Sequence, residues 1–574
     1  MTAPQTVLTG FLDLVDQDPE ASVAMDKRLG RWRSRTRGEL LADVATLAAA
    51  FGNLGIGRGV TVLTATADRF DWLSVDLALQ AQGARVCPVP AAASDASLEQ
   101  ALSLSGATHV VARGQHLVDR LLTLEEAGSV GRVERILYQD AAGLAEYQDE
   151  RLTGLDELRA RSDLGDTTRE LRSSIDAQGE SDAAILSISA GAEGAPRVTT
   201  LTHGALYLAT RAVIETFELG PKDRLLAYRP LADPTERTTT IYASLLSGAL
   251  LALAETREDV RAAMYEIAPT FLHLTPRLVD DVLTEVSVRL QAARGLKGAV
   301  GARWLASNRG EDPRSPGLLD RALVTFPVLE KLGLDKARTI LVSGSEVSPG
   351  ARRQAISLGL PLRTAFATSA VGGIVSASEP GDLRPGACGV PLPGFELDLT
   401  EAGELIVGGP AAPGSVPTGD AALLDDGSLL LRGRLNERLD LGDGVVIDLL
   451  EVESTLRSSP YIREAVVARQ PDGATVVAVE LAEGPTARWA SKQGLAFVTY
   501  RSLVALPEVV TFAQQEVASA LEQTPLHAAD EVRVLPAKLE ALPGTLVAGE
   551  KVRRDAVMAE ALAVDVAATS PTPG

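Results

Sequence analysis

Short apolar segments alternate with longer segments of helical spacing over much of this chain. Residues 38–54 have a helical period, residues 59–64 have the pattern of a strand, and residues 72–82 return to the helical period. The alternation resumes at residues 183–188 and continues as far as residues 362–365. A chain that alternates in this way lays its strands side by side in a parallel sheet and packs its helices on the faces. We therefore expect an α/β fold.

The composition changes near residue 386, where glycine, proline and short strands become frequent. Turn signals separate these strands, and a compact unit of mixed helices and strands follows them. We predict a large N-terminal domain at residues 1–433, built of parallel sheets covered by helices, in which residues 386–433 form a small β-rich subdomain. The other predicted segments are a hinge at residues 434–441, a small α+β C-terminal domain at residues 442–565 and a disordered tail at residues 566–574.

The composition also limits what the protein can be. The 574 residues, 45% of them hydrophobic, suffice for more than one domain. A formal net charge of −21 argues against a nucleic acid as a partner. The two cysteines, Cys87 and Cys388, do not make a disulfide framework, so we expect a cytoplasmic protein. We find no signal peptide and no membrane-spanning segment, which leaves a soluble protein or one in peripheral contact with a membrane.

A glycine-spaced loop follows one of the apolar strands. Gly191 and Gly194 let backbone N–H groups turn inward and form a concavity that binds anions, the usual way to hold a phosphate. Ser189 and Arg197 stand at its two ends. Glu193 places a negative charge inside it. The loop therefore indicates nucleotide chemistry and raises the question of whether the chain still performs it.

Further motifs stand in a fixed order along the chain. They are residues 225–237 (LLAYRPLADPTER), residues 269–277 (PTFLHLTPR), residues 384–396 (RPGACGVPLPGFE), residues 418–420 (TGD) and residues 459–462 (SPYI). Together with the glycine loop, this order resembles the adenylate-forming superfamily of AMP-binding, acyl-activating enzymes, and within it the long-chain acyl-CoA synthetases. Each motif alone is weak, but their order over hundreds of residues is specific.

The resemblance implies a large N-terminal domain over which a small mobile C-terminal domain swings. It also implies a reaction in two steps. ATP and a long-chain fatty acid give acyl-AMP and pyrophosphate, and coenzyme A then displaces AMP to give a thioester. The implied cofactors are ATP, Mg²⁺ and coenzyme A.

The resemblance assigns a set of residues to the nucleotide. They are Ser189, Gly191, Gly194, Arg197, Thr368, Thr418, Asp420 and Arg434. In the family, the carboxylate that matches Asp420 accepts hydrogen bonds from the ribose hydroxyls, and such charge-assisted bonds are roughly twice as strong as neutral ones. A turn residue is the alternative for Asp420, because Gly-Asp is common in turns.

Arg434 and Lys551 are the residues expected to take part in catalysis. Arg434 belongs to the hinge motif, where Glu437 stands at a position usually held by aspartate. By resemblance, Lys551 bridges the fatty carboxylate and the α-phosphate as charge develops in the transition state. Extra residues between Thr545 and Lys551 leave its register open. A solvated charged linker is the alternative for the hinge, and a basic helix start is the alternative for Lys551.

Two departures from the family pattern weaken the site. Glu193 replaces a phosphate-binding hydroxyl. If it faces the phosphates, like charges ~4 Å apart repel by about 4 kcal/mol at an effective dielectric near 20, or roughly three orders of magnitude in binding. A Glu193 side chain that points outward or coordinates a cation is the alternative. Ser369 stands where the family has the glutamate that binds Mg²⁺, and a hydroxyl is a poor ligand for a hard cation. The metal ligand is therefore left unknown.

Two functions are compatible with these residues. The first is an ATP-dependent long-chain fatty acid–CoA ligase of weakened activity. The alternative is a catalytically impaired homologue, a pseudoenzyme that holds an acyl or adenylate ligand or regulates a partner. Transfer of the acyl group to a carrier protein is a third alternative. His203 and His273 are isolated and are interpreted as core histidines instead of metal ligands. The acyl chain length and the oligomeric state are left open.

Overall fold

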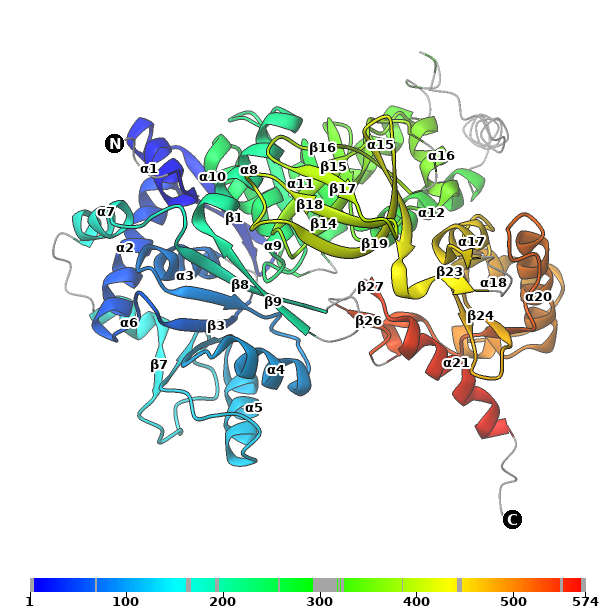
Figure 1. Cartoon of the computed structure of the whole chain (residues 1–574), viewed down its shortest axis with the longest axis horizontal. Coiled ribbons are helices and arrows are strands. Elements are labelled where there is room, and N and C mark those ends of the chain that lie inside the picture. Colours follow the sequence, from blue (N-terminus) through cyan, green and yellow to red (C-terminus); the bar gives the residue numbers. More distant parts are fainter. Residues whose placement is uncertain are drawn as a thin grey trace.

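Two large β-sheets and a small C-terminal unit make up the architecture (Figure 1). The structure is a computed structural model. It describes residues 5–67, 70–161, 167–190, 196–256, 259–292, 317, 321, 325–382, 384, 386–440, 446–542, 544–547 and 551–568.

The smaller of the two large sheets has seven strands within these described ranges, in the order β7-β6-β5-β3-β4-β8-β9. Its neighbours are parallel except for β9, which pairs antiparallel with β8. The strands are β3 (Thr61–Ala65), β4 (Arg85–Pro88), β5 (His109–Ala112), β6 (Arg135–Tyr138), β7 (Leu152–Gly154), β8 (Ala183–Ala190) and β9 (Pro196–Thr202). Every residue of β3 is buried, as expected for a parallel strand covered on both faces.

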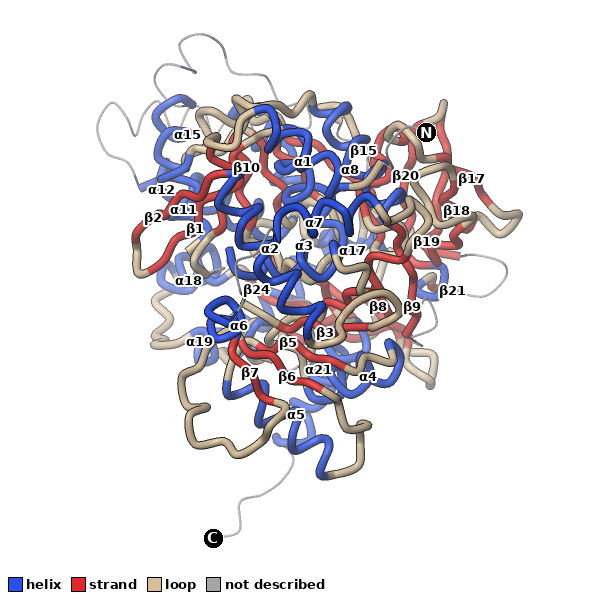
Figure 2. The backbone as a smooth tube through the Cα atoms, turned by 90° about the vertical axis from the view of Figure 1, so that its left-hand side faces the viewer, coloured by secondary structure: helices blue, strands red, loops and turns tan. Residues whose placement is uncertain are grey.

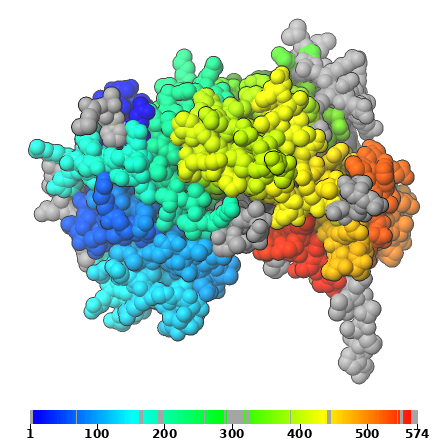
Figure 3. All heavy atoms as spheres, viewed as in Figure 1, coloured from blue at the N-terminus to red at the C-terminus, as the bar shows by residue number. Residues whose placement is uncertain are grey.

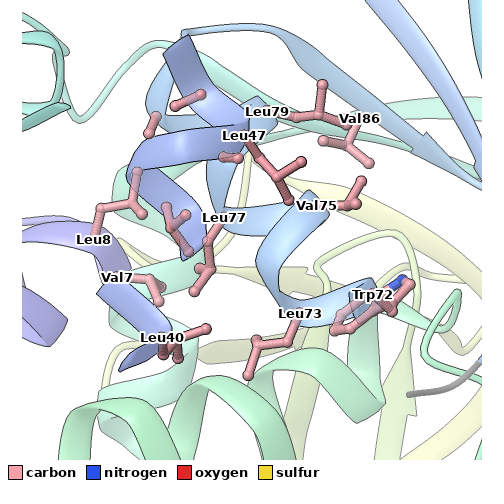
Figure 4. Close-up of a cluster of buried hydrophobic side chains, with 14 of the residues drawn as sticks. Val7, Leu8, Leu40, Leu47, Trp72, Leu73, Val75, Leu77, Leu79 and Val86 are labelled. Carbon is pink, nitrogen blue, oxygen red and sulfur yellow. The ribbon is translucent and has the colours of Figure 1, made fainter. Parts of the chain in front are cut away.

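Helices cover this sheet, and α3 lies deepest among them. α3 (Phe70–Ala81) is buried on almost every side, which fits its apolar sequence. Figure 4 shows Leu73 and Leu77 of α3 gathered in one apolar cluster with Leu8 and Leu40. The other helices of this half are α1 (Val7–Gln17), α2 (Arg37–Asn53), α4 (Asp95–Ser105), α5 (Gln115–Glu126), α6 (Leu155–Arg161) and α7 (Thr167–Asp176).

The larger sheet has thirteen strands in the described part of the chain, in the order β17-β18-β19-β20-β16-β15-β14-β13-β12-β10-β11-β1-β2. Its centre, from β14 to β1, is parallel, and antiparallel strands extend it at both ends. The strands are β1 (Ser22–Arg28), β2 (Arg31–Thr36), β10 (Arg224–Ala227), β11 (Leu250–Leu253), β12 (Phe271–Leu274), β13 (Thr339–Val342), β14 (Leu362–Thr368), β15 (Gly373–Ala377), β16 (Ala387–Pro391), β17 (Glu396–Leu399), β18 (Glu404–Gly408), β19 (Val416–Asp425) and β20 (Ser428–Arg434). The strands of the predicted β-rich segment therefore continue a large sheet.

The helices associated with the larger sheet include one irregular segment. Residues 237–241 form a π-helix, η1 (Arg237–Ile241), which leads into α10 (Tyr242–Ser247). π-helical turns are rare and often occur at functional sites. The regular helices are α8 (His203–Phe217), α9 (Pro234–Glu236), α11 (Val260–Ile267), α12 (Pro276–Ala292), α15 (Phe326–Leu332) and α16 (Pro349–Leu358).

The C-terminal unit has its own small sheet, in the order β23-β24-β25. Figure 2 shows the sheets from the side, and Figure 3 shows the unit, in orange and red, against one end of the larger part. Its elements are η3 (Leu435–Glu437), β21 (Leu439–Asp440), β22 (Val446–Ile447), α17 (Leu449–Leu456), β23 (Ile462–Arg469), β24 (Thr475–Leu481), α18 (Glu483–Lys492), α19 (Tyr500–Val504), α20 (Pro507–Leu521), β25 (Glu531–Val534), η4 (Leu539–Ala541), β26 (Leu546–Val547), β27 (Lys551–Val552) and α21 (Arg554–Ala568). None of the helices that the structure describes combines the length and the apolar character needed to cross a bilayer.

Candidate nucleotide site

Three of the predicted nucleotide-binding residues come together on two paired strands. Asp420 of β19 lies opposite Arg434 of β20, and Arg434 Nε is 3.2 Å from Asp420 Oδ1. Arg434 Nη1 donates to the carbonyl of Thr418 at 2.8 Å. The hydroxyl of Thr418 accepts from the backbone N–H of Asp420 at 3.1 Å. The three residues therefore form one unit, held by an ion pair and two hydrogen bonds that involve the backbone.

The turn within this unit needs its glycine. Gly419 has φ +75°, a conformation that residues with a Cβ rarely adopt. Its N–H donates to Oε1 of Glu404 at 2.9 Å, which ties the turn to β18. Because the carboxylate of Asp420 is held by an arginine, the unit offers an acceptor and donors side by side. Ribose hydroxyls and phosphate oxygens require that combination.

A small cavity of about 50 Å³ lies beside this unit. It is lined by Arg432, Gly433, Arg434, Glu437, Leu449, Leu450, Glu453 and Arg554. Glu437, the residue assigned to the hinge, is 3.5 Å from Arg554, and Arg554 also pairs with Glu453. The carboxylates of Glu453 and Glu437 raise the pKa of the Arg554 guanidinium and keep it charged, although its burial opposes this.

The phosphate loop connects two paired strands. β8 and β9 form an antiparallel pair in which Ser189 stands opposite Arg197. The side chain of Arg197 is exposed. Gly191, Glu193 and Gly194 lie outside the described residues, and so does the side chain of Ser189. The loop thus joins two paired strands, whereas only the strand before it was expected.

The predicted metal position follows β14. Thr368 ends this strand, and its hydroxyl accepts from the N–H of Ala370 at 3.3 Å. The turn that begins with Ser369 carries no carboxylate. In the part of the chain described, no group of three or more His, Cys, Asp or Glu side chains could hold a metal ion. This donor set does not fit a Mg²⁺ ion held by the protein, because Mg²⁺ in proteins prefers carboxylate ligands.

Lys551 opens β27 at the end of a short hairpin. Its backbone pairs with Val547 of β26. The Lys551 side chain is not among the described atoms. Thr545, just before the hairpin, is fully buried, and its hydroxyl donates to the carbonyls of Leu539 and Leu542 at 2.7 and 2.8 Å. Figure 1 shows the hairpin on the side of the C-terminal unit that faces the larger part.

His273 is a buried histidine with two polar partners, which fits its interpretation as a core histidine. His273 Nδ1 is 2.9 Å from Oε2 of Glu236, and His273 Nε2 is 2.8 Å from Oγ of Ser343. All three residues are buried. They come from β12, from the residue after β13 and from α9, which follows β10. These three residues, which form a polar line, therefore lie near the carboxyl ends of parallel strands, where α/β sheets bind ligands.

Burial sets the protonation of this polar line. It raises the pKa of Glu236 to about 8 and lowers the pKa of His273 well below its usual value. Arg229, whose Nε is 3.9 Å from Glu236, opposes the rise. His203, the other histidine interpreted as a core residue, is also buried, and its pKa falls to about 4 for the same reason. Both histidines are therefore core residues, as predicted.

A second cavity, of about 370 Å³, lies away from these residues. It is lined by Gly52, Gly55, Ile56, Gly57, Arg58, Gln82, Gly83, Ser174, Ala177 and Gln178. It shares no residue with the predicted site. The size of this cavity does not make it the nucleotide site, because the unit of Thr418, Asp420 and Arg434 lies outside it.

Comparisons with known proteins give a consistent result. A model of the family described as AMP-binding enzyme matches residues 13–419. A long-chain fatty-acid–CoA ligase named FadD15, from Mycobacterium tuberculosis, is 27% identical over 96% of this chain and 94% of its own length. The solved structure of an anthranilate CoA ligase with anthranoyl-AMP superposes with a TM-score of 0.72 at 15% identity, covering 99% of each chain. The adenylation domain of a carboxylate reductase from Mycobacterium chelonae gives 0.75 at 15% identity, covering 98% of this chain and 91% of that one.

Proposed function

Because this chain belongs to the AMP-binding enzyme family, we propose that it is an ATP-dependent acid–thiol ligase that converts a long-chain fatty acid to its acyl-CoA thioester. The observation that carries the proposal is the unit of Thr418, Asp420 and Arg434, in which an aspartate and an arginine stand together on β19 and β20. The similarity to FadD15 over almost the whole chain supports the substrate class.

Each residue takes a role that suits its chemistry. Asp420 accepts hydrogen bonds from the ribose hydroxyls, and Arg434 holds the Asp420 carboxylate in place and faces the phosphates. Arg197 supplies positive charge at the end of the phosphate loop. The ammonium group of Lys551 approaches from the other unit and stabilises charge that develops between the fatty carboxylate and the α-phosphate.

The two steps balance without further reagents. A carboxylate oxygen of the fatty acid attacks the α-phosphorus of ATP, and the bond to pyrophosphate breaks. The sulfur of coenzyme A then attacks the acyl carbonyl, loses its proton, and displaces AMP. The turn after β14 takes no part in holding Mg²⁺, since it offers no carboxylate.

Pyrophosphate release tests the proposal directly. The purified chain with ATP, Mg²⁺ and a long-chain fatty acid is expected to release pyrophosphate. Lys551→Ala is expected to lower the rate by about 10²–10³-fold, since it removes a charge that acts mainly in the transition state. Asp420→Ala is expected to weaken ATP binding by about 10–100-fold, the equivalent of losing charge-assisted bonds of about 1.5–3 kcal/mol. Asp398→Ala serves as the matched control, because Asp398 is an exposed aspartate on β17, which β18 separates from β19.

A second candidate function rests on the turn at Ser369. Since this turn carries no carboxylate for Mg²⁺, an impaired homologue that holds an acyl adenylate without forming it is the alternative. That function predicts no pyrophosphate from a panel of acyl chains, together with a rise in melting temperature when a stable acyl-adenylate analogue is added. If the protein released no pyrophosphate and the analogue did not shift its melting temperature, both candidates would be contradicted.

A further inference from the structure

A cluster of charged side chains joins the start of α12 to the C-terminal unit. Arg277 of α12 has its Nη2 3.3 Å from Oε2 of Glu480 and 2.7 Å from Oε1 of Glu540. Arg463 of β23 reaches back to α12, with its Nη2 2.9 Å from Oδ1 of Asp281. Arg463 also approaches Glu480 at 3.5 Å and Glu540 at 3.3 Å. Two guanidinium groups and three carboxylates thus alternate across the contact, which we name the α12 bridge.

The geometry of α12 accounts for the bridge. Arg277 and Asp281 are four residues apart, so their side chains lie on the same face of the helix. They carry opposite charges, and each meets its complement on the C-terminal unit. The partners are far apart in sequence, since 203 residues separate Arg277 from Glu480.

Glu480 is the centre of the bridge and differs from an ordinary surface carboxylate. Its side chain is 0% exposed, whereas that of Glu540 is 47% exposed. Burial raises the pKa of Glu480, and Arg277 and Arg463 oppose the rise. A carboxylate buried in this way depends on its cations, because without them its charge is left uncompensated.

Glu480 also supports the segment that leads to Lys551. Its Oε2 accepts from the backbone N–H of Leu539 at 3.1 Å. The carbonyl of Leu539 accepts from the hydroxyl of Thr545 at 2.7 Å. The carbonyl of Thr545 accepts from the N–H of Arg553 at 2.7 Å, so Thr545 is bonded to both sides of the β26–β27 hairpin. A continuous chain of hydrogen bonds therefore runs from Arg277 to the base of that hairpin.

We propose that Arg277 and Glu480 are positioning residues: through the α12 bridge they hold the hairpin that carries Lys551 in register with the larger part of the molecule. The inference rests on the proposed function for the role of Lys551, and it goes beyond it by assigning two residues that do not touch the substrates. Thr545 and Leu539 transmit the constraint, and Arg463 with Asp281 forms the second point of attachment.

The variants are chosen to separate attachment from folding. Glu480→Gln removes the charge but keeps an amide oxygen for the N–H of Leu539, so the support within the C-terminal unit remains. Arg277→Gln removes the cation on α12, and Arg277→Lys retains its charge without the planar fork. Asp281→Asn tests the more exposed attachment point and serves as the second variant if the others fold poorly. Arg172→Gln is the control, because Arg172 pairs with Asp16 within the larger part.

The first readout is the distance between two dyes on the full-length protein. Tyr265→Cys and Val498→Cys place labels on either side of the bridge at side chains 61% and 95% exposed, and the native Cys87 and Cys388 are buried. Arg277→Gln and Glu480→Gln are expected to shift or broaden the energy-transfer distribution, and Arg172→Gln to leave it unchanged. Distributions that match the wild type in every bridge variant would overturn the proposal.

The second readout is kinetic. Arg277→Gln and Glu480→Gln are expected to lower the rate of pyrophosphate release at least tenfold with ATP affinity unchanged, because the nucleotide unit lies on β19 and β20, and Arg277→Lys is expected to recover part of the rate. An equal loss of rate and ATP affinity, with no rescue by lysine, would indicate a merely structural role and contradict the proposal. The distance readout does not depend on activity. A wild-type protein without pyrophosphate release whose bridge variants still shift the distribution would therefore contradict the proposed function and leave the bridge in place.

Discussion

At the scale of single residues, Glu236 and His273 both stay neutral near pH 7 because burial disfavours the charged form of each. The pKa of Glu236 rises to about 8, and that of His273 falls well below its usual value. Protonated Glu236 can donate to His273 Nδ1, and His273 Nε2 can then donate to Ser343. A neutral relay satisfies three buried polar groups without an ion, which costs less than burying a charge.

The relay predicts a dependence of stability on pH. With a pKa raised by burial from its usual 4.5 to about 8, Glu236 contributes stability that is complete below pH 4.5 and is lost as pH rises through about 8. Burial lowers the pKa of His273 well below its usual 6.5, so His273 contributes stability that is complete above pH 6.5 and is lost at lower pH. Between pH 6.5 and 8, Glu236 therefore acts alone, and the unfolding free energy should fall by about 2 kcal/mol from this group.

Glu236→Gln tests this, because the amide imitates the protonated acid and does not ionise. Urea denaturation at a series of pH values should show the variant gaining on the wild type as pH rises from 6.5 to 8. Parallel curves over that range would show that the Glu236 carboxyl does not titrate there. The neighbouring charges, on Arg229 and Asp233, are the same in both proteins.

At the scale of elements, a buried ion pair joins α3 to the π-helix η1. Arg237 pairs with Asp76, and both side chains are almost completely buried. The hydroxyl of Tyr242 and the amide of Gln80 each donate to Oδ2 of Asp76 at 2.8 Å. The guanidinium lies 4.6 Å from the ring of Trp72 on α3. Through α3, the network therefore fixes the π-helix η1 against the seven-stranded sheet.

Asp76→Asn is expected to destabilise the larger part by about 3–5 kcal/mol, since it leaves a buried guanidinium without its counter-charge. Urea denaturation followed by tryptophan fluorescence measures this, because Trp72 lies against Arg237. Asp95→Asn is the control: Asp95 pairs with Arg120 but is 65% exposed, so its loss should cost less than about 1 kcal/mol. Equal effects of the two variants would contradict the importance of burial.

At the scale of the whole molecule, the apolar cores separate along the sequence. Among the described residues, each hydrophobic cluster lies either wholly before or wholly after residues 432–438. The contacts that link the two parts include the charged α12 bridge and the approach of Arg432 on β20 to Glu451 on α17 at 3.9 Å. An interface held by charges is weaker and more salt-sensitive than one held by a shared apolar core.

This separation predicts two calorimetric transitions instead of one. ATP should raise the midpoint of the transition that belongs to the larger part, since Asp420 lies there, and have a smaller effect on the other. Added salt should bring the transition midpoint of the C-terminal unit closer to the midpoint of the same transition in the Glu480→Gln variant. A single cooperative transition with or without ATP would contradict the division.

Much of the secondary structure was predictable because it depends on local signals. The helices expected at residues 38–54 and 72–82 and the strand expected at residues 59–64 occur at those positions to within two residues at each end. α16 begins where Ser348 accepts a hydrogen bond from the N–H of Ala351 and Pro349 follows. The strand pair β1–β2 was missed, because its arginine-rich sequence lacks the apolar alternation of a buried strand.

The candidate site was also predictable only in part. The motifs of residues 418–420 and of Arg434 were recognisable, and the structure brings them together through the register of β19 and β20. The role of Arg554 and the α12 bridge were not predicted. Ser369 and Lys551 were assigned by resemblance alone, and their roles stay predictions.

By itself, the sequence determined the order and type of most elements, the α/β class and the family motifs, because periodicity, capping and turn chemistry act over a few residues. Only the tertiary structure decided that His273 bonds to Glu236 and Ser343, that Arg237 finds Asp76, and that Arg277 meets Glu480. Those partners lie between 37 and 203 residues apart. A charged or polar side chain does not specify its partner in the sequence, since any complementary group would satisfy it, and packing of the apolar elements selects the one that is buried beside it.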